Sequence, residues 1–495
     1  MMTNFEELTQ KIIETDEIEM TFRYISDEDL QQIYSLLQRI LQKKSKIYLC
    51  EYLFMMLKEV LVNSIRASAK REFFARNGLD PEKDDDYKTG IVRFKNEIIL
   101  NWSAHASYLR YSQFFIVLRF KFSENIDIEI INNSPLVEYE KMRIDSRLSS
   151  ADKYKNILDA YTDLSDSQES AGLGIVMIVL LLKSIGLDKS YFKIECVDSN
   201  TVTSIHIPAQ IIPHEIASEI REKILKEVDM LPSLPKSLQK IMEMCNSENL
   251  EFSELALEIE KNPALSADLL KLSNSSSFVT RMPVNTILQA VKIVGSNNIL
   301  KMLYAVSSYT LLKEKFPRME KEWEHANKTS IFAVKIAEDF GLIDSIETIS
   351  LGALLHDIGK ILLLAVEGKL FQSIQELTKN LQMESNRALE EATIGISHSE
   401  LGILLAKKWN YPEDLSALIE FHQDPFLAPE KYKRIVEIVY LANILSNKLE
   451  TDVNFYSYDL AVLHSFNIYS IEDFNSFHYK LESHFRSNNK NPFFG

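Results

Sequence analysis

The first half of the chain alternates between helical and strand-like spacing of its apolar residues. Apolar residues recur every three or four positions over residues 46–77, which predicts a long helix. Strands are predicted at 90–94, 97–102, 113–122, 126–130, 191–198 and 201–207, and an apolar helix at 172–186. Residues 1–45 are helical in pattern and polar-faced, which indicates an N-terminal extension. We therefore expect an α/β domain over residues 46–210.

The second half loses the strand pattern. A charged connector helix is predicted over residues 211–230, and consecutive amphipathic helices, punctuated by proline and glycine, over residues 231–450. An aromatic-rich tail follows at residues 451–495. The predicted fold class is multidomain: an α/β domain followed by an all-α helical bundle.

Composition and charge narrow the classes of function. The net charge of −16 and the pI near 5.3 argue against nucleic-acid binding. The cysteines are far apart, as is usual for reduced thiols of a cytosolic protein. The longest apolar run, 175–182, is shorter than the about 20 residues of a membrane span, and the N-terminus has no signal-peptide core. We expect a cytoplasmic protein with no membrane segment.

A histidine and an aspartate stand side by side in an apolar run, LLHDIGK at 354–360. The Asp357 carboxylate must be paired, hydrogen-bonded or metal-bound there, because burying a bare charge is costly. His356 and Asp357 together suit a divalent transition metal, which could activate water for phosphate-ester hydrolysis. The residues alone leave two explanations open: a metal site, and a polar network that fixes helix packing.

Residues 231–450 resemble an HDOD domain, a helical relative of the HD metal-dependent phosphohydrolases. The motifs that carry the resemblance are LPSLPKSLQKIMEM (231–244), IEKNPALSADLLKLSNSSSF (259–278), ILQAVKIVGSNNIL (287–300), WEHANKTS (323–330), LGALLHDIGK (351–360), SHSELGILLAKKWNYPEDLSALIEFH (397–422) and VYLANILSN (439–447). By position, the implied metal ligands are His325, His356, Asp357, His398, His422 and Asn443. The implied metal is iron, manganese or zinc.

Two departures from the HD enzymes bear on activity. Asn443 stands where active HD enzymes have their closing aspartate, and it is a poorer ligand than a carboxylate. After His422 the chain lacks the His-His-Glu and Gly-Tyr-Pro signatures of the related cyclic-dinucleotide phosphodiesterases. HDOD domains are regarded as signalling or scaffold modules. The resemblance therefore implies a module that does not hydrolyse phosphoesters and that either retains a bound metal or has lost it.

The N-terminal half carries a second set of candidates. Glu59 and Asn63 are four residues apart and share one helix face, as a base and a magnesium ligand could. Gly172 and Gly174 open the apolar helix, where backbone N–H groups can approach phosphate. Each feature alone also has an ordinary explanation, a solvated helix face or a turn.

In their order along the chain these features resemble the GHKL fold, the ATPase domain of histidine kinases and their gyrase and chaperone relatives. KEVLVNSIRAS (58–68) and SAGLGI (170–175) carry the resemblance over residues 46–210. It implies a GHKL-like α/β sandwich that binds magnesium-ATP or magnesium-ADP under a lid at 137–170. The adenine box is degenerate, because IEIINNSPL (128–136) offers Asn132 in place of the family's aspartate and has no glycine.

Together the two resemblances predict a cytoplasmic signal-transduction protein. A nucleotide-sensing domain would be followed by a non-catalytic HDOD module that contacts signalling proteins. Two alternatives are a metal-dependent phosphohydrolase of nucleotides or cyclic nucleotides acting through Asp357, and an ATPase or kinase acting through Glu59. The sequence also leaves open that the N-terminal domain is a structural or dimerisation module, and in the second case the protein would be a homodimer.

Overall fold

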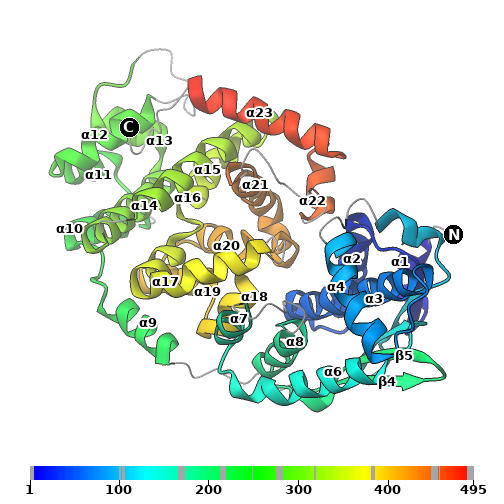
Figure 1. Cartoon of the computed structure of the whole chain (residues 1–495). Helices are drawn as coiled ribbons and strands as arrows, with labels where there is room; N and C mark the ends of the chain where they lie inside the picture. The colour runs from blue at the N-terminus through cyan, green and yellow to red at the C-terminus, as the bar shows by residue number, and fades with distance from the viewer. Residues whose placement is uncertain are drawn as a thin grey trace. The chain divides into compact units, whose positions relative to one another are not determined.

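The computed structural model describes the chain apart from residues 1–4, 100–101, 103–105, 166–172, 212–218, 248, 275–282, 317–318, 381–384, 448–454, 456–457 and 488–495. The chain folds into two compact units. The N-terminal unit comprises residues 1–216 with 391–395, and the C-terminal unit comprises residues 217–390 with 396–495. Helices predominate in both, and the N-terminal unit adds a small sheet (Figure 1).

The N-terminal unit is built on a five-stranded antiparallel sheet with strand order β1-β2-β3-β5-β4. Buried and more exposed residues alternate along β2 and β3, so one face of these strands is buried, and the long helix α3 contacts both. Its helices and strands are α1 (Phe5–Glu14), β1 (Glu17–Phe22), α2 (Asp27–Lys43), α3 (Cys50–Arg76), α4 (Asp84–Glu97), β2 (Ile116–Lys121), β3 (Ile126–Asn132), α6 (Glu138–Ser150), α7 (Ile157–Ser165), α8 (Leu173–Ser184), β4 (Phe192–Val197) and β5 (Asn200–Ile207).

Residues 1–45 are not a separate helical extension. Residues 17–22 form β1, which pairs along its whole length with β2. Ile18, Met20 and Phe22 are buried and the residues between them are exposed, a strand period that the helical reading overlooked. The N-terminal segment therefore completes one edge of the sheet.

The strand predicted at 90–94 is also wrong, and the described residues of the one predicted at 97–102, which are 97–99 and 102, form no strand. Residues Asp84–Glu97 form α4, in which Gly90 and Phe94 are the buried positions, one helical turn apart. A Cβ at Gly90 would lie 2.3 Å from the Phe74 ring, so the glycine allows α4 to approach α3 closely. The predicted hairpin of β4 and β5 is present. Its two-residue turn is Asp198-Ser199, both with positive φ, one residue earlier than expected.

The C-terminal unit is entirely helical over the residues that the structure describes. Its α-helices are α9 (Glu219–Met230), α10 (Lys236–Cys245), α11 (Phe252–Glu260), α12 (Pro263–Ser273), α13 (Ile287–Val294), α14 (Ser296–Lys315), α15 (Glu320–Asp339), α16 (Ile346–Leu355), α17 (Ile358–Asn380), α19 (His398–Lys408), α20 (Glu413–Phe421), α21 (Glu430–Ser446), α22 (Leu460–Ser465) and α23 (Ile471–Ser487). The helix α18 (Arg387–Ile394) is divided, since its residues 391–394 belong to the N-terminal unit.

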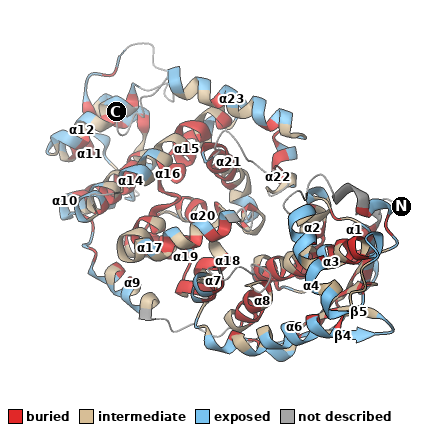
Figure 2. Cartoon of the chain, in the orientation of Figure 1, coloured by how far each residue is buried: buried red, intermediate tan, exposed pale blue. Residues whose placement is uncertain are grey.

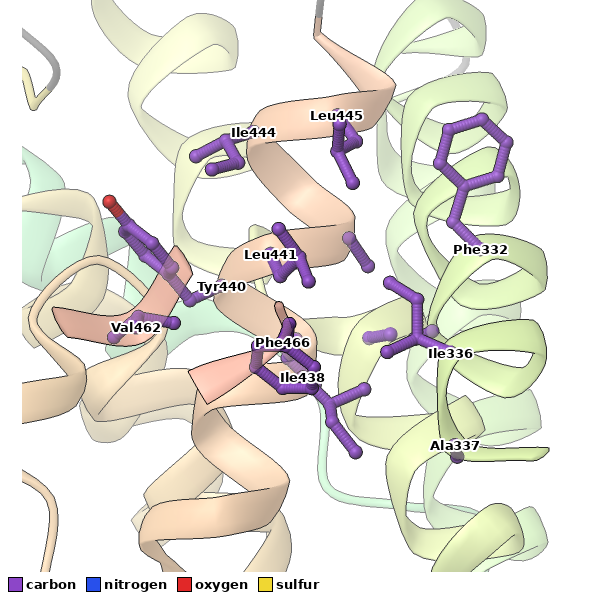
Figure 3. Packing of buried hydrophobic residues seen from close by; sticks show 14 of the residues in the cluster. Phe332, Ile336, Ala337, Ile438, Tyr440, Leu441, Ile444, Leu445, Val462 and Phe466 are labelled. Carbon is purple, nitrogen blue, oxygen red and sulfur yellow. The ribbon is translucent and has the colours of Figure 1, made fainter. Parts of the chain in front are cut away.

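A hydrophobic cluster joins α15, α21 and α22 (Figure 3). Phe332 and Ile336 of α15 and Leu441 and Leu445 of α21 belong to it, and all four are fully buried. Packing of these two helices fixes the neighbouring polar residues that they carry, since protein interiors are close-packed and resist displacement. The cluster thereby sets the position of His325 relative to Asn443.

The expected C-terminal tail is part of this core. Val462 and Phe466, from α22 and its end, and Phe474 of α23 are buried in the same cluster. Lys480 of α23 donates a hydrogen bond to Asp339 of α15 at 2.7 Å. The aromatic residues that suggested a tail are core residues of the helical unit.

One stretch of the described chain, Ile343–Lys379, is long and apolar enough to cross a membrane by length and composition, with a mean hydropathy of 1.8. Within it, 78% of the most apolar window is buried inside the protein, and every residue of α16 is buried (Figure 2). The stretch also breaks between α16 and α17. It therefore forms buried core helices of the C-terminal unit.

Candidate metal centre

His356 and Asp357 lie at the junction of α16 and α17, since α16 ends at Leu355 and α17 begins at Ile358. Both are buried. Gly359 follows directly, and a Cβ there would lie 2.0 Å from the backbone oxygen of His398. The glycine thus lets α17 approach the start of α19, which brings a third predicted ligand to the pair.

One oxygen of the Asp357 carboxylate, Oδ2, faces His325 and His356. The distances from Oδ2 to their Nε2 atoms are 3.8 Å and 3.5 Å. Nε2 of His325 also lies 3.0 Å from Oδ1 of Asn443. We call this group, His325, His356 and Asn443 around Oδ2, half-site A.

The other oxygen of Asp357, Oδ1, faces His398 and His422. Their Nε2 atoms lie 3.5 Å and 3.4 Å from Oδ1 and 3.4 Å from each other. Both imidazoles are buried. We call His398 and His422 around Oδ1 half-site B. The structure therefore brings all six predicted residues together, with Asp357 shared between two groups.

The opposite nitrogen of each buried imidazole has its own partner. Nδ1 of His356 donates to the carbonyl of Ala353 at 2.6 Å, and Nδ1 of His422 donates to the carbonyl of Ile419 at 2.8 Å. A carbonyl can only accept, so these nitrogens carry a proton, and in a neutral ring the lone pair then lies on Nε2. Nε2 of His356 is buried without a hydrogen-bond partner. This tautomer suits metal binding through Nε2.

Two charged residues of the site were not among the predicted ligands. Glu390 is buried and accepts hydrogen bonds from Nδ1 and the backbone N–H of His398, each at 2.7 Å. Lys360 lies one turn after Asp357, and its ammonium donates to Oδ2 at 3.2 Å. Lys360 could have been found from its place in LLHDIGK. Glu390 is eight residues before His398, and no regular spacing signals that contact.

The protonation states follow from burial and from these partners. Burial lowers the pKa of His356 to about 3 and that of His325 to about 4. Burial acts against ionisation of Asp357, but Lys360 and His356 outweigh it and hold the pKa of Asp357 well below its usual range. Burial likewise lowers the pKa of His398, but Glu390 outweighs it and raises that pKa above its usual value. Half-site A therefore presents neutral imidazoles, and Asp357 is a carboxylate.

These donors fit a divalent transition metal. The groups His325-His356-Asp357 and Asp357-His398-His422 each offer three ligand atoms within 4.8 Å of one another. Neutral imidazole and carboxylate are the ligand forms that iron, manganese and zinc bind. A dication held here would polarise a bound water or a phosphoryl oxygen.

In the N-terminal unit the second predicted set gathers around α3. Nδ2 of Asn63 donates to Oε1 of Glu59 at 2.9 Å, and a Cβ at Gly174 would lie 1.8 Å from that oxygen. Asn132, at the end of β3, donates to the carbonyl of Ser64 at 2.9 Å. Gly172 lies outside the described residues. Glu59, Asn63 and Gly174 are thus neighbours, and Asn132 is anchored to the same helix.

The fold and the site define a helical domain with an HD-type cluster of histidine and aspartate. A model of the HDOD domain family matches residues 231–425, so this segment is an HDOD domain, as its motifs predicted. Asn443 lies beyond the matched segment. The match does not extend to the N-terminal unit, where the GHKL resemblance stays a prediction.

Other proteins resemble this chain over longer spans. A protein of Treponema pallidum (strain Nichols) is 26% identical over 488 residues, covering 97% of this chain and 94% of that protein. Among solved structures, an HDOD domain protein of Geobacter sulfurreducens is 22% identical with a TM-score of 0.40, covering 56% of this chain and 98% of that one. A putative metal-dependent phosphohydrolase of Shewanella amazonensis SB2B is 17% identical with a TM-score of 0.38, covering 54% and 97%. A putative signal transduction protein of Marinobacter aquaeolei VT8 is 15% identical with a TM-score of 0.40, covering 59% and 74%.

Proposed function

We propose that this chain is a cytoplasmic regulatory protein of a signalling pathway, whose HDOD domain holds a divalent transition metal and acts by contact with other proteins. The observation that carries the metal is the placement of Asp357, whose two oxygens face four imidazoles at 3.4–3.8 Å. The observation that favours a non-catalytic role is the neutral Asn443, which contacts His325 at half-site A where a carboxylate would add a second negative charge.

The first experiment measures metal and turnover on the same preparations. The full chain and the variant Asp357→Asn would be loaded with iron(II), manganese(II) or zinc, freed of excess metal, and analysed for bound metal. Both would then be assayed against cyclic nucleotides and simple phosphoesters. We expect metal in the parent protein alone, and hydrolysis in neither. Asn is the matched replacement because it keeps the shape of Asp357 and removes its charge.

Two outcomes would contradict this proposal. Equal metal content in parent and variant, or none in either, would leave the cluster as a polar network that fixes helix packing. Turnover that disappears in Asp357→Asn would make the protein a metal-dependent phosphohydrolase. The shared carboxylate favours this second candidate function, because Asp357 would offer one oxygen to each half-site, and a pair of metal ions would stabilise the attacking and leaving oxygens of a displacement at phosphorus.

For the N-terminal unit we propose binding of a magnesium nucleotide in a GHKL-like site, as the sensory half of the protein. The support is the contact of Asn63 with Glu59 and the close approach of Gly174 to the same carboxylate. A glycine at the start of α8 leaves the Glu59 carboxylate room that a larger residue would occupy. Catalysis by this unit, as an ATPase or kinase, would require Glu59 to act as the base.

Nucleotide binding is tested by hydrogen exchange on the full chain. Millimolar magnesium-ATP or magnesium-ADP should protect residues 140–165 and 173–175, and Asn63→Ala should abolish that protection. Arg66→Ala is the matched control, because Arg66 is exposed on the same helix. Unchanged exchange at millimolar nucleotide would leave the unit as a structural or dimerisation module.

A further inference from the structure

The two half-sites around Asp357 are not equivalent. We propose that the cluster is built for one dication, at half-site B, and that the Lys360 ammonium takes the place of a second cation at half-site A. This inference rests on the proposed metal binding of the HDOD domain. It goes further by assigning the metal to His398, His422 and one oxygen of Asp357.

The ligand atoms of half-site B already have the spacing of a metal site. Nε2 of His398, Nε2 of His422 and Oδ1 of Asp357 form a nearly equilateral triangle with sides of 3.4–3.5 Å. The point equidistant from these atoms lies about 2.0 Å from each, which is the length of a zinc–nitrogen bond. A dication could enter with little movement of the side chains, and it would displace any proton held at Nε2 of His398.

Both imidazoles of half-site B are held for ligation from behind. Nδ1 of His422 is bonded to the carbonyl of Ile419, and Nδ1 of His398 to the carboxylate of Glu390. Nε2 is therefore the nitrogen that each ring presents to Oδ1 of Asp357. A carboxylate behind a ligand histidine increases the basicity of the ring and fixes its orientation. Among the described histidines of the cluster, His398 alone has such a carboxylate partner.

Half-site A is arranged differently. Nε2 of His325 is engaged by Oδ1 of Asn443 at 3.0 Å and stands 3.8 Å from Oδ2. That oxygen already accepts a hydrogen bond from Lys360 at 3.2 Å. Nε2 of His356 is the one unengaged nitrogen. A single free nitrogen and an oxygen shared with an ammonium make a poor site for a dication.

The charged residues around the two half-sites also favour a dication at half-site B. A dication at half-site B would lie against Asp357, with the buried Glu390 behind His398. A dication at half-site A would meet the Lys360 ammonium at Oδ2, with the neutral Asn443 beside it. Like charges around one carboxylate oxygen repel, so Lys360 disfavours metal at half-site A and neutralises the half of Asp357 that the metal leaves uncovered.

The test is a zinc titration by calorimetry, with stoichiometry checked by elemental analysis of the full-length protein. The parent protein should bind one ion per chain. His422→Ala should lower the affinity more than about 100-fold, since a ligand matters at least as much as its outer partners. His325→Ala should lower it far less. Lys360→Met should admit a second ion. Asn replacements of His422 and His325 serve where an alanine variant fails to fold.

The outcomes separate this inference from the proposed function. Two ions per parent chain, or an equal loss of affinity in His325→Ala and His422→Ala, would overturn the single-ion assignment while metal binding stands. A single ion in Lys360→Met would overturn the role of Lys360. No zinc bound by the parent chain would overturn the metal function itself, and this inference with it.

Discussion

Glu390 and His398 are joined by two hydrogen bonds of 2.7 Å, one from the imidazole Nδ1 and one from the backbone N–H, inside the C-terminal unit. The carboxylate is completely buried. The same carboxylate oxygen accepts both bonds. Glu390 therefore caps the first turn of α19 and also fixes the orientation of the imidazole ring of a candidate ligand. The hydrogen bond from Nδ1 to Glu390 therefore fixes the ring orientation in which Nε2 of His398 faces Asp357.

The first prediction follows from that contact. Glu390→Gln should lower the affinity for the bound metal about 10–100-fold, the usual effect of removing the partner behind a ligand histidine. Glutamine keeps the size of the side chain but lacks the charge that makes the imidazole basic. The measurement is competition of the loaded full chain against a chelator of known affinity.

The control for this charge removal is Glu376→Gln. Glu376 is exposed on α17, so its replacement should leave the metal affinity unchanged. Equal affinities of Glu390→Gln and the parent protein would mean that Glu390 only supports the helix start and does not tune the ligand.

The second prediction concerns the helix contact beneath the site. Gly359→Ala would place a Cβ 2.0 Å from the backbone oxygen of His398 and 2.6 Å from the backbone nitrogen of Gly402. Backbone atoms cannot rotate away, so α17 and α19 must separate, and overpacking of this kind costs about 1–3 kcal/mol. Thermal unfolding should show a clear fall in Tm together with a weakened metal site.

Gly368→Ala is the control further along α17, directly after the kink at Glu367. A Cβ there has nothing within 4 Å. Because alanine favours a helix over glycine by about 0.5–1 kcal/mol, Tm should stay constant or rise. Similar losses in both variants would show that the close approach at Gly359 does not explain the effect.

The sequence predicted the convergence of the six candidate ligands because they belong to short motifs. His356 and Asp357 sit in one heptapeptide, and the amphipathic helices around them have a strong period. Glu390 was not predicted because it reaches His398 across a turn, and no local spacing encodes that approach. The tail was misjudged for a related reason, since Phe466 and Phe474 are buried only by contact with distant helices.

In the N-terminal unit the errors came from short segments. The residues Gly90–Phe94 form a brief apolar run, which periodicity cannot assign to helix or strand, and helical packing against Phe74 decided it. The strand Glu17–Phe22 was overlooked between two helices, although its alternation is regular. Long elements such as α3 and α8 were placed correctly because many residues repeat the same period.

The third prediction is a pH dependence in the N-terminal unit. Glu140 of α6 is buried against Lys70 and Arg71 of α3. Burial acts to raise the pKa of Glu140, but the two cations outweigh it and lower the pKa below the ordinary 4.5. The unfolded chain therefore takes up the proton first on acidification. The stabilisation is complete above about pH 4.5 and is lost as pH falls through the folded-state pKa.

Hydrogen exchange of amides in α3 and α6, measured from pH 7 down to pH 3.5, would show this loss after correction for intrinsic exchange. Glu140→Gln should be less protected at neutral pH and should lose less protection on acidification. Glu138→Gln, at an exposed position of α6, should behave like the parent protein. A parallel acid response in Glu140→Gln and the parent would assign the pH dependence to other groups.

The fourth prediction restores a carboxylate at the closing position. In Asn443→Asp the new oxygens could still accept from His325 and from Asn447, whose contacts with Asn443 Oδ1 are both 3.0 Å. The buried charge should destabilise the metal-free protein, because a carboxylate without a full counter-charge is costly to desolvate. A dication at half-site A would supply that counter-charge.

Metal should therefore raise the Tm of Asn443→Asp more than that of the parent chain, and most of all when Lys360→Met is combined with it. A ligand at 100 times its dissociation constant adds about 2.7 kcal/mol, enough for a shift of several degrees. Asn443→Ala is the control: it removes the same hydrogen bonds without adding charge, so metal should not rescue it beyond the parent response. If Asn443→Asp is destabilised and metal does not restore its Tm, half-site A cannot hold a dication even with two carboxylates. The geometry of His325, and not the missing charge, would then keep the metal out.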